Sequence, residues 1–245
     1  MSNDDKLKVR QNVSKKKVFK ELSIVRDTVF WTDIVAEGRN ENAIFARPFN
    51  DKDALPQKLT SKKYKIKNNF HGYGGKSYKC IYLKNNFYLI WVDQITNAVW
   101  FQIFKEVASN YRSQKRYLDS VQEPRQLSKS IDGNFDSSFV ISQKNFLYGI
   151  CEINNRDYLF SLNLKKTKQD LYRIKKFKNF AGELSSNTPV SLLSWVEWDS
   201  PYMPWEKNDL CFAQIDLDGE ITKIKKFSDK LINAKKTFLF FNLIG

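Results

Sequence analysis

The histidine, cysteine and serine residues of this chain offer few ways to build a catalytic site. His71 is the only histidine. A serine hydrolase of the α/β type needs a G-x-S-x-G nucleophile with its histidine base later in the chain. This sequence has no such motif. Its histidine also lies upstream of most of its serines, which is the wrong order for such a pair. Cys80 could use His71 as a base across the intervening turn, although a cysteine in an apolar strand is normally an unreactive core residue. We therefore favour a turn histidine that pairs locally with the backbone, with a catalytic base as the alternative.

Two further groups of residues resemble functional sites, a phosphate-binding loop and a carboxylate pair, but each lacks residues that such a site requires. The string Gly74-Gly75-Lys76-Ser77 resembles part of a phosphate-binding loop, which requires a glycine where Phe70 stands. Glycines that permit a tight turn before a strand are the simpler interpretation. Glu197 and Asp199 alternate on one face of a predicted strand and could bind a metal or act as acids. Because no histidine or third carboxylate accompanies them, an exposed polar rim is favoured.

The cysteines and the length of apolar runs limit the cellular setting. Cys80, Cys151 and Cys211 each lie alone in an apolar run, without a C-x-x-C pair. This pattern predicts reduced, buried thiols, no structural zinc site and no metal or cofactor. No run approaches the roughly 20 apolar residues of a membrane span, and the amino terminus is polar and rich in lysine. We expect a cytoplasmic protein that is not inserted in a membrane.

The chain is strongly basic, with a formal net charge of +14 in 245 residues. Such a charge raises nucleic acid as a partner. Lysine and asparagine are abundant throughout, however, so solvated surface lysines are favoured over a nucleic-acid footprint. The first twenty residues contain seven lysines or arginines against two aspartates, which predicts a basic flexible tail over residues 1–20.

The stretch from Leu192 to Leu210 predicts a long β-hairpin. An apolar strand enters it, Pro201 and Pro204 stiffen the connection, and a second strand continues through Phe212, Ile215 and Leu217. The connection carries an unusual amount of aromatic and apolar bulk: Trp195, Trp198, Tyr202, Met203 and Trp205. We expect this tip to be buried. The aromatic residues could stack peptides or bases, but packing between sheets and docking onto another domain are favoured.

Short aromatic and β-branched runs separated by turns continue along the rest of the chain. A large apolar residue occurs at a comparable place in four successive runs, and we call these residues anchors: Phe30, Ile90, Ile150 and Trp195. They are 60, 60 and 45 residues apart. A meander of about four strands repeated at this spacing predicts an all-β fold, a partial β-propeller of about four blades built from antiparallel four-stranded meanders over residues 21–227. The charged link from Glu106 to Leu127 could hold a helical turn. Residues 228–245 are predicted to form an apolar end strand that looks cut off and would be prone to aggregate if uncovered.

These residues resemble the amino-terminal propeller of the prolyl oligopeptidase family, in the branch of acylaminoacyl-peptidases and dipeptidyl-aminopeptidase-like serine peptidases. Two motifs carry the resemblance. A V-H-E-Y-G-G type turn of that branch is matched by Phe70 with His71, Gly72, Tyr73, Gly74 and Gly75. A W-x-x-W-D-H-P-N-M-P-W-D type hairpin is matched by Trp195, Trp198, Asp199, Pro201, Met203, Pro204 and Trp205. The chain departs from the family at Gly72, Ser200 and Tyr202, where Glu, His and Asn are usual.

The resemblance implies a function that the chain cannot perform alone. Relatives continue into an α/β-hydrolase domain with a Ser-Asp-His triad, and this sequence ends before such a domain begins. We therefore expect a truncated, non-catalytic propeller fragment, whose counterpart in relatives gates the access of peptides to the catalytic serine. The partners implied are a hydrolase domain or a second copy joined through the open propeller edge. The alternatives are a basic and aromatic binding module for nucleic acid or an acidic protein, and a degraded gene product.

Overall fold

A computed structural model describes residues 19–35, 41–51, 53–72, 74–108, 116–187, 190–216 and 218–228. Within these ranges the chain forms seventeen β-strands and one short 3-10 turn, η1 (Phe70–Gly72). The all-β prediction is confirmed. In this part of the chain there is no helix with the length and apolar character needed to cross a membrane.

The strands form four antiparallel sheets, and each sheet is a meander in which consecutive strands pair. We call the sheets blades 1 to 4 in chain order. Blade 1 contains β1 (Phe19–Val25), β2 (Thr28–Val35), β3 (Glu41–Pro48) and β4 (Gln57–Lys58). Blade 2 contains β5 (Tyr78–Leu83), β6 (Asn86–Asp93), β7 (Ala98–Ala108) and β8 (Arg116–Ser120), and β9 (Arg125–Gln126) also pairs with β7.

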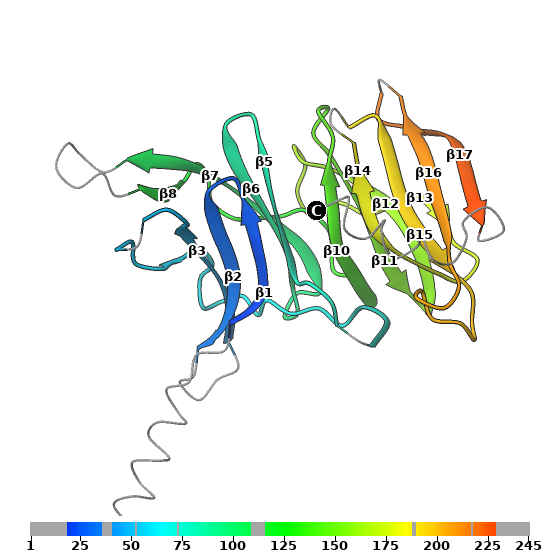
Figure 1. Cartoon of the computed structure of the whole chain (residues 1–245), viewed down its shortest axis with the longest axis horizontal. Coiled ribbons are helices and arrows are strands. Elements are labelled where there is room, and N and C mark those ends of the chain that lie inside the picture. Colours follow the sequence, from blue (N-terminus) through cyan, green and yellow to red (C-terminus); the bar gives the residue numbers. More distant parts are fainter. Residues whose placement is uncertain are drawn as a thin grey trace, which may run out of the picture.

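The second half of the chain repeats the same plan. Blade 3 contains β10 (Gly133–Ile141), β11 (Phe146–Ile153), β12 (Arg156–Asn163) and β13 (Tyr172–Lys176). Blade 4 contains β14 (Phe180–Ser186), β15 (Leu192–Trp198), β16 (Asp209–Ile215) and β17 (Ile221–Ser228). Blades 1 and 2 occupy one side of the molecule and blades 3 and 4 the other (Figure 1).

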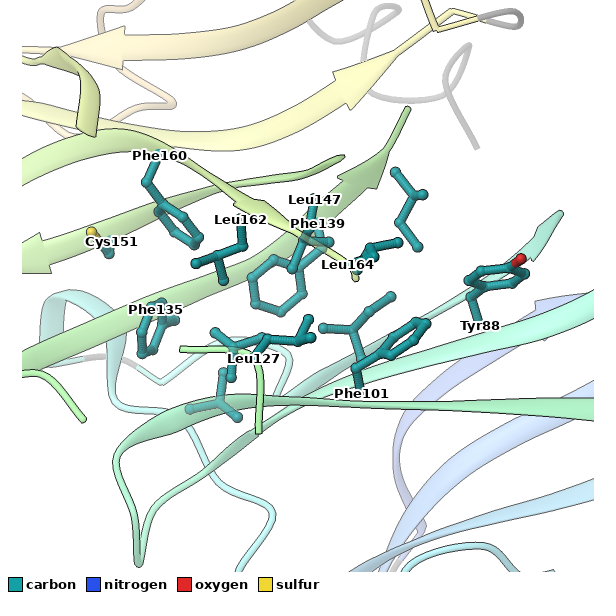
Figure 2. Close-up of a cluster of buried hydrophobic side chains, with 14 of the residues drawn as sticks. Tyr88, Phe101, Leu127, Phe135, Phe139, Leu147, Cys151, Phe160, Leu162 and Leu164 are labelled. Carbon is teal, nitrogen blue, oxygen red and sulfur yellow. The ribbon is translucent and has the colours of Figure 1, made fainter. Parts of the chain in front are cut away.

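Among the described residues, three hydrophobic cores lie between successive blades. The first strands of neighbouring blades contact one another, β1 with β5, β5 with β10 and β10 with β14, which is the arrangement of blades around a common axis. The core between blades 2 and 3 contains Phe101, Leu127, Phe139 and Phe160 among others (Figure 2). Because a two-faced apolar sheet cannot bury both faces alone, each inner blade depends on both neighbours.

The predicted anchors belong to these cores. Phe30, Ile90, Ile150 and Trp195 are each 0% exposed and occupy the second strand of blades 1 to 4 respectively. The repeat inferred from their spacing is therefore the blade repeat of the structure. The prediction of a partial propeller with about four blades is confirmed.

Two details of the predicted strand order are wrong. The link from Glu106 to Leu127 holds no helical turn in its described part; it contains the end of β7, then β8 and β9. The strand pattern also does not indicate β14 (Phe180–Ser186), which precedes the predicted hairpin and is the first strand of blade 4. Its polar sequence, with glycine and two serines, hid this strand from a search for apolar alternation.

Several predicted features lie outside the described residues. These are most of the basic tail, Tyr73, Leu217, and the end strand beyond Ser228. β1 begins at Phe19 and β17 ends at Ser228. The domain boundaries at residues 20 and 228 remain predictions.

Candidate functional site

The motif around His71 forms a turn that is held by its own side chains. Asn68 accepts a hydrogen bond from the backbone N–H of Phe70 (3.1 Å) and donates one to the carbonyl of Lys76 (3.1 Å), so it ties the start of the turn to its end. His71 has a φ of +50°, and Gly74 and Gly75 have φ values of +91° and +111°. Glycine adopts such angles without steric cost, as the glycine interpretation of this string predicted.

His71 is paired with a buried carboxylate from blade 3. Its Nε2 lies 2.8 Å from Oδ2 of Asp157, and their side chains are only 10% and 2% exposed. A carboxylate can only accept, so this ring nitrogen carries a proton. The same oxygen of Asp157 accepts a hydrogen bond from the backbone N–H of Ala181 (2.7 Å) in blade 4. Asp157 therefore joins the His71 turn, blade 3 and blade 4 through one buried atom.

Aromatic rings enclose the imidazole. It stacks on Phe70 (3.8 Å between ring centroids) and meets the edges of Phe180 (5.1 Å) and Trp198 (5.6 Å). Phe180 in turn stacks on Trp198 at 5.7 Å. We call His71, Asp157, Phe70, Phe180 and Trp198 the His71 cluster. It brings together the two sequence motifs, which lie more than 100 residues apart in the chain.

The backbone of the same turn is held by a second acidic residue. The N–H of His71 donates to Oε2 of Glu152 (3.2 Å), and the side-chain amide of Asn134 donates to the same oxygen (3.3 Å). Neither Glu152 nor Asp157 was among the predicted site residues. Both lie within two residues of the Asn154-Asn155 turn of blade 3. Acidic residues are common beside turns, so their presence in the sequence did not indicate a role in the site.

The geometry of the His71 cluster does not resemble a nucleophile with its base. Among the described residues, the hydrogen-bond partner of the imidazole is Asp157, and no serine hydroxyl or cysteine thiol bonds to it. Cys80 belongs to the core between blades 1 and 2, whereas Phe70 belongs to the core between blades 3 and 4, so the possible Cys80–His71 pair does not form. Burial also raises the pKa of the Cys80 thiol well above its usual range.

The base of the hairpin is packed and ionically anchored. Trp195 is 0% exposed, meets the edge of the Phe177 ring, and donates from its indole N–H to Oε1 of Glu197 (2.8 Å). Glu197 also pairs with Lys175 (3.2 Å) and Lys226 (3.8 Å). Although burial alone would raise the pKa of Glu197, the Trp195 hydrogen bond and the nearby lysines hold it below its usual value.

The tip of the hairpin is exposed, which corrects the prediction of a buried tip. Trp205 is 72% exposed and Tyr202 46%. The connection is ordered by local hydrogen bonds instead: Met203 N–H donates to Glu206 Oε2 (2.8 Å), and the Asn208 amide donates to the carbonyl of Pro204. These local bonds order the connection that carries the two exposed rings.

The remaining predicted site residues lie in the same connection, except Gly72. Asp199 accepts a hydrogen bond from the Asn179 amide and its backbone carbonyl accepts one from the N–H of Tyr202 (3.0 Å). Pro201 follows Asp199 in this turn, and Gly72 belongs to η1. Glu197 and Asp199 form no ligand set, and no cluster of three or more His, Cys, Asp or Glu side chains arranged to hold a metal ion occurs in the described ranges.

The sequence matches no family model and no curated protein. The fold does match solved structures. A Mycobacterium tuberculosis puromycin-hydrolyzing peptidase aligns over 86% of this chain and 32% of its own, with a TM-score of 0.66 and 15% identity. A puromycin hydrolase gives a TM-score of 0.66 and 16% identity over the same shares of the two chains.

A prolyl endopeptidase also aligns, over 90% of this chain and 28% of its own, with a TM-score of 0.50 and 13% identity. The chain has the propeller fold of these peptidases. It spans only about a third of their length. The expected resemblance to the propeller part of the prolyl oligopeptidase family is therefore confirmed at the level of the fold.

Proposed function

We propose that this chain is the non-catalytic propeller portion of a peptidase of the prolyl oligopeptidase type, and that it controls the access of peptides to a separate hydrolase domain. The observation that carries the proposal is the match of nearly the whole chain to about a third of each of two puromycin-hydrolysing peptidases. Such a share leaves about two thirds of each of these two proteins without a counterpart in this sequence.

The chemistry of the described residues supports a structural role for the motif residues. The imidazole of His71 pairs with Asp157 through Nε2, contacts three aromatic rings, and is only 10% exposed, which favours a structural role over a catalytic one. A buried pair of this kind, with a backbone N–H as third partner, orients the segments that carry it. The His71 cluster thus sets how blade 4 lies against blade 3, and with it the direction in which the hairpin projects.

The exposed end of the hairpin is the surface that we assign to contact with the hydrolase domain. Trp205 and Tyr202 present aromatic area that the propeller itself does not cover. Large aromatic residues held on an ordered loop are typical anchors of interfaces. On this proposal, the His71 cluster fixes the position of the hairpin connection, and Tyr202 and Trp205 in that connection bind the hydrolase domain.

The absence of catalysis is tested on the purified chain. We expect no turnover of chromogenic aminoacyl or acylaminoacyl substrates and no labelling by a fluorophosphonate probe, because the imidazole of His71 pairs with Asp157 and, among the described residues, with no serine hydroxyl. A puromycin-hydrolysing peptidase under the same conditions is the positive control. Stoichiometric labelling of this chain would contradict the proposal.

A second candidate is a binding module for single-stranded nucleic acid. It is favoured by the net charge of +14 together with the exposed Trp205, and by Lys207, whose ammonium lies 5.1 Å from the centre of the Tyr202 ring. An affinity for oligonucleotides that falls steeply with salt, and that Trp205→Ala reduces, would support this function. Salt-independent or undetectable binding at low salt would exclude it.

A further inference from the structure

The outer edge of blade 4 is an open strand edge. β17 (Ile221–Ser228) pairs with β16 on one side, and no strand in the described part of the chain pairs with its other side. The backbone N–H and C=O groups on that side are therefore available to another chain. An edge of this kind can accept one more strand.

The outer strands of the other blades offer less. β4 has two residues, β8 and β13 have five each, and β17 has eight. On blade 2 the chain covers part of the edge itself. The side-chain amide of Gln57 donates to the carbonyl of Leu118 in β8 (2.5 Å) and accepts a hydrogen bond from its N–H (2.8 Å). A side chain of blade 1 thus completes part of the edge of β8 in the way that a paired strand would.

The side chains of β17 are positively charged. The strand contains Lys223, Lys225 and Lys226 and no acidic residue. Lys226 is paired with Asp209 (2.6 Å) and Glu197 (3.8 Å). Lys223 and Lys225 are exposed, and neither forms an ion pair with a described residue. The strand with the open edge therefore carries two positive charges that no neighbouring carboxylate compensates.

The neighbouring outer strand extends this positive charge. β13 in blade 3 carries three cationic residues and no acidic one. Glu197 lies between the two strands, since it pairs with Lys175 of β13 (3.2 Å) as well as with Lys226 of β17. β8 in blade 2, by contrast, contains one arginine and one aspartate. The charge is thus concentrated on the rim of blades 3 and 4, which favours an acidic partner.

Only part of β17 is regular. Its register against β16 shifts between Thr222 and Lys225, and Lys223 in this part has a positive φ of +46°. Bulges and exposed lysines both protect an edge from uncontrolled aggregation. The pairing with β16 is regular from Lys225 to Ser228. A strand added there is short, so its binding depends strongly on charge.

The register of β17 also specifies the side chains that an added strand needs. Lys225 pairs with Phe212 and Phe227 with Leu210, while Cys211 between them belongs to the core against blade 3. Lys225 and Phe227 therefore lie on the face of the sheet that points away from blade 3. Phe227 is 41% exposed, and its ring meets that of Phe212 at 5.5 Å. A carboxylate opposite Lys225 and an apolar side chain opposite Phe227 match this face.

We propose that the rim of blade 4 binds an extended acidic segment of a partner protein, which adds to the sheet beside Lys225–Ser228 of β17. Backbone hydrogen bonds hold the segment, its carboxylates face Lys223 and Lys225, and an apolar side chain packs on Phe227. A single-stranded nucleic acid also offers negative charge, but it lacks the alternating backbone donors and acceptors that an edge strand pairs with, which is why we prefer a peptide.

The test uses the full chain and defined peptides. A fluorescein-labelled octapeptide of alternating glutamate and valine should bind in an anisotropy titration. Binding should weaken as the salt rises from about 0.05 to 0.5 M, because exposed charges are screened. N-methylation of every second residue removes the backbone donors on one edge of the peptide and keeps its charge. Of the two N-methylated peptides that are possible, at least one should bind about tenfold more weakly than the parent.

Charge reversal separates specific pairing from misfolding. The double variant Lys223→Glu, Lys225→Glu should bind the glutamate peptide at least about tenfold more weakly, and it should bind a peptide of alternating lysine and valine that the wild-type chain does not bind. Lys144→Glu with Lys165→Glu is the matched control, because both lysines are exposed in turns of blade 3. This control should keep the affinity for the glutamate peptide within about twofold.

Three results would each overturn the proposal: no binding of the glutamate peptide at low salt, equal binding of the parent and both N-methylated peptides, or tighter binding of an oligothymidylate of the same charge. The last two would mean that the rim attracts negative charge without pairing to a strand. The inference does not depend on the gating of peptides, and these measurements leave that function untested.

Discussion

At the start of the hairpin, Trp198 lies against the imidazole of His71, while at its far end Trp205 is 72% exposed. Both tryptophans belong to the same short motif. The Trp198 ring is packed between His71 of the η1 turn and Phe180 of β14, whereas Trp205 lies in a loop that is ordered by its own hydrogen bonds. The comparison shows that one motif can serve two purposes: its first half closes the junction of blades 3 and 4, and its second half remains available for contact with another molecule.

The largest effect is expected from Asp157 in the His71 cluster. Asp157→Ala removes the acceptor for both the His71 ring and the Ala181 N–H, and leaves buried donors without a partner. We expect a loss of about 3 kcal/mol in the free energy of unfolding, measured by urea denaturation. The control is Asp170→Ala, which breaks the exposed ion pair with Lys129 and should change stability by less than about 0.5 kcal/mol. Equal, small losses in both variants would mean that the cluster does not hold the junction.

An intermediate, pH-dependent effect is expected at the hairpin base. The pKa of Glu197 in the folded chain lies below its ordinary value, so its ionised form stabilises the fold above that ordinary value, and the contribution is lost as the pH falls through the folded pKa. Glu197→Gln should cost about 1 kcal/mol at neutral pH and progressively less in acid. Urea midpoints from neutral to acidic pH measure this difference. A cost that is the same at every pH would contradict the assignment; the exposed Glu123→Gln is the control.

The smallest effect on stability is expected at the tip. Trp205→Ala should change the free energy of unfolding by less than about 0.5 kcal/mol, because most of the ring is already in solvent. Trp198→Ala, which removes a ring packed on His71 and Phe180, should cost about 2 kcal/mol in the same measurement. If Trp205→Ala proves as destabilising as Trp198→Ala, the tip is part of the structural core and is not a free surface.

The predictions from sequence succeeded where local pattern and burial agree. Phe30, Ile90, Ile150 and Trp195 are large apolar residues in the second strands, and their spacing followed the blade length because each must enter the core between sheets. The prediction failed for β14, whose inward-facing positions are small or bulged and carry little hydrophobic pattern. It also failed for Trp205, since aromatic character alone does not distinguish a ring that is buried by a neighbouring sheet from one that an ordered loop exposes.

The candidate site was predicted in its parts but not in its connections. The two motifs were recognised along the chain, and His71 was expected to pair locally with the backbone of its turn. Its ring pairs instead with Asp157, 86 residues later. Such a pair depends on the stacking of one blade on the next, and an aspartate beside a turn looks the same in sequence whether it faces water or a histidine.

The sequence alone determined the class of the fold, the number of blades and the positions of the buried anchors, because alternation and turn chemistry act over a few residues and repeat with each sheet. Only the tertiary structure decided which motif residues meet and which faces stay open. The stacking of sheets brings Asp157 to His71. It also buries Leu184 in the Glu-Leu-Ser segment of β14, while Leu22 in the Glu-Leu-Ser segment of β1 stays exposed. Identical local sequences therefore acquire different environments, since burial is set by the neighbouring blade and not by the strand itself.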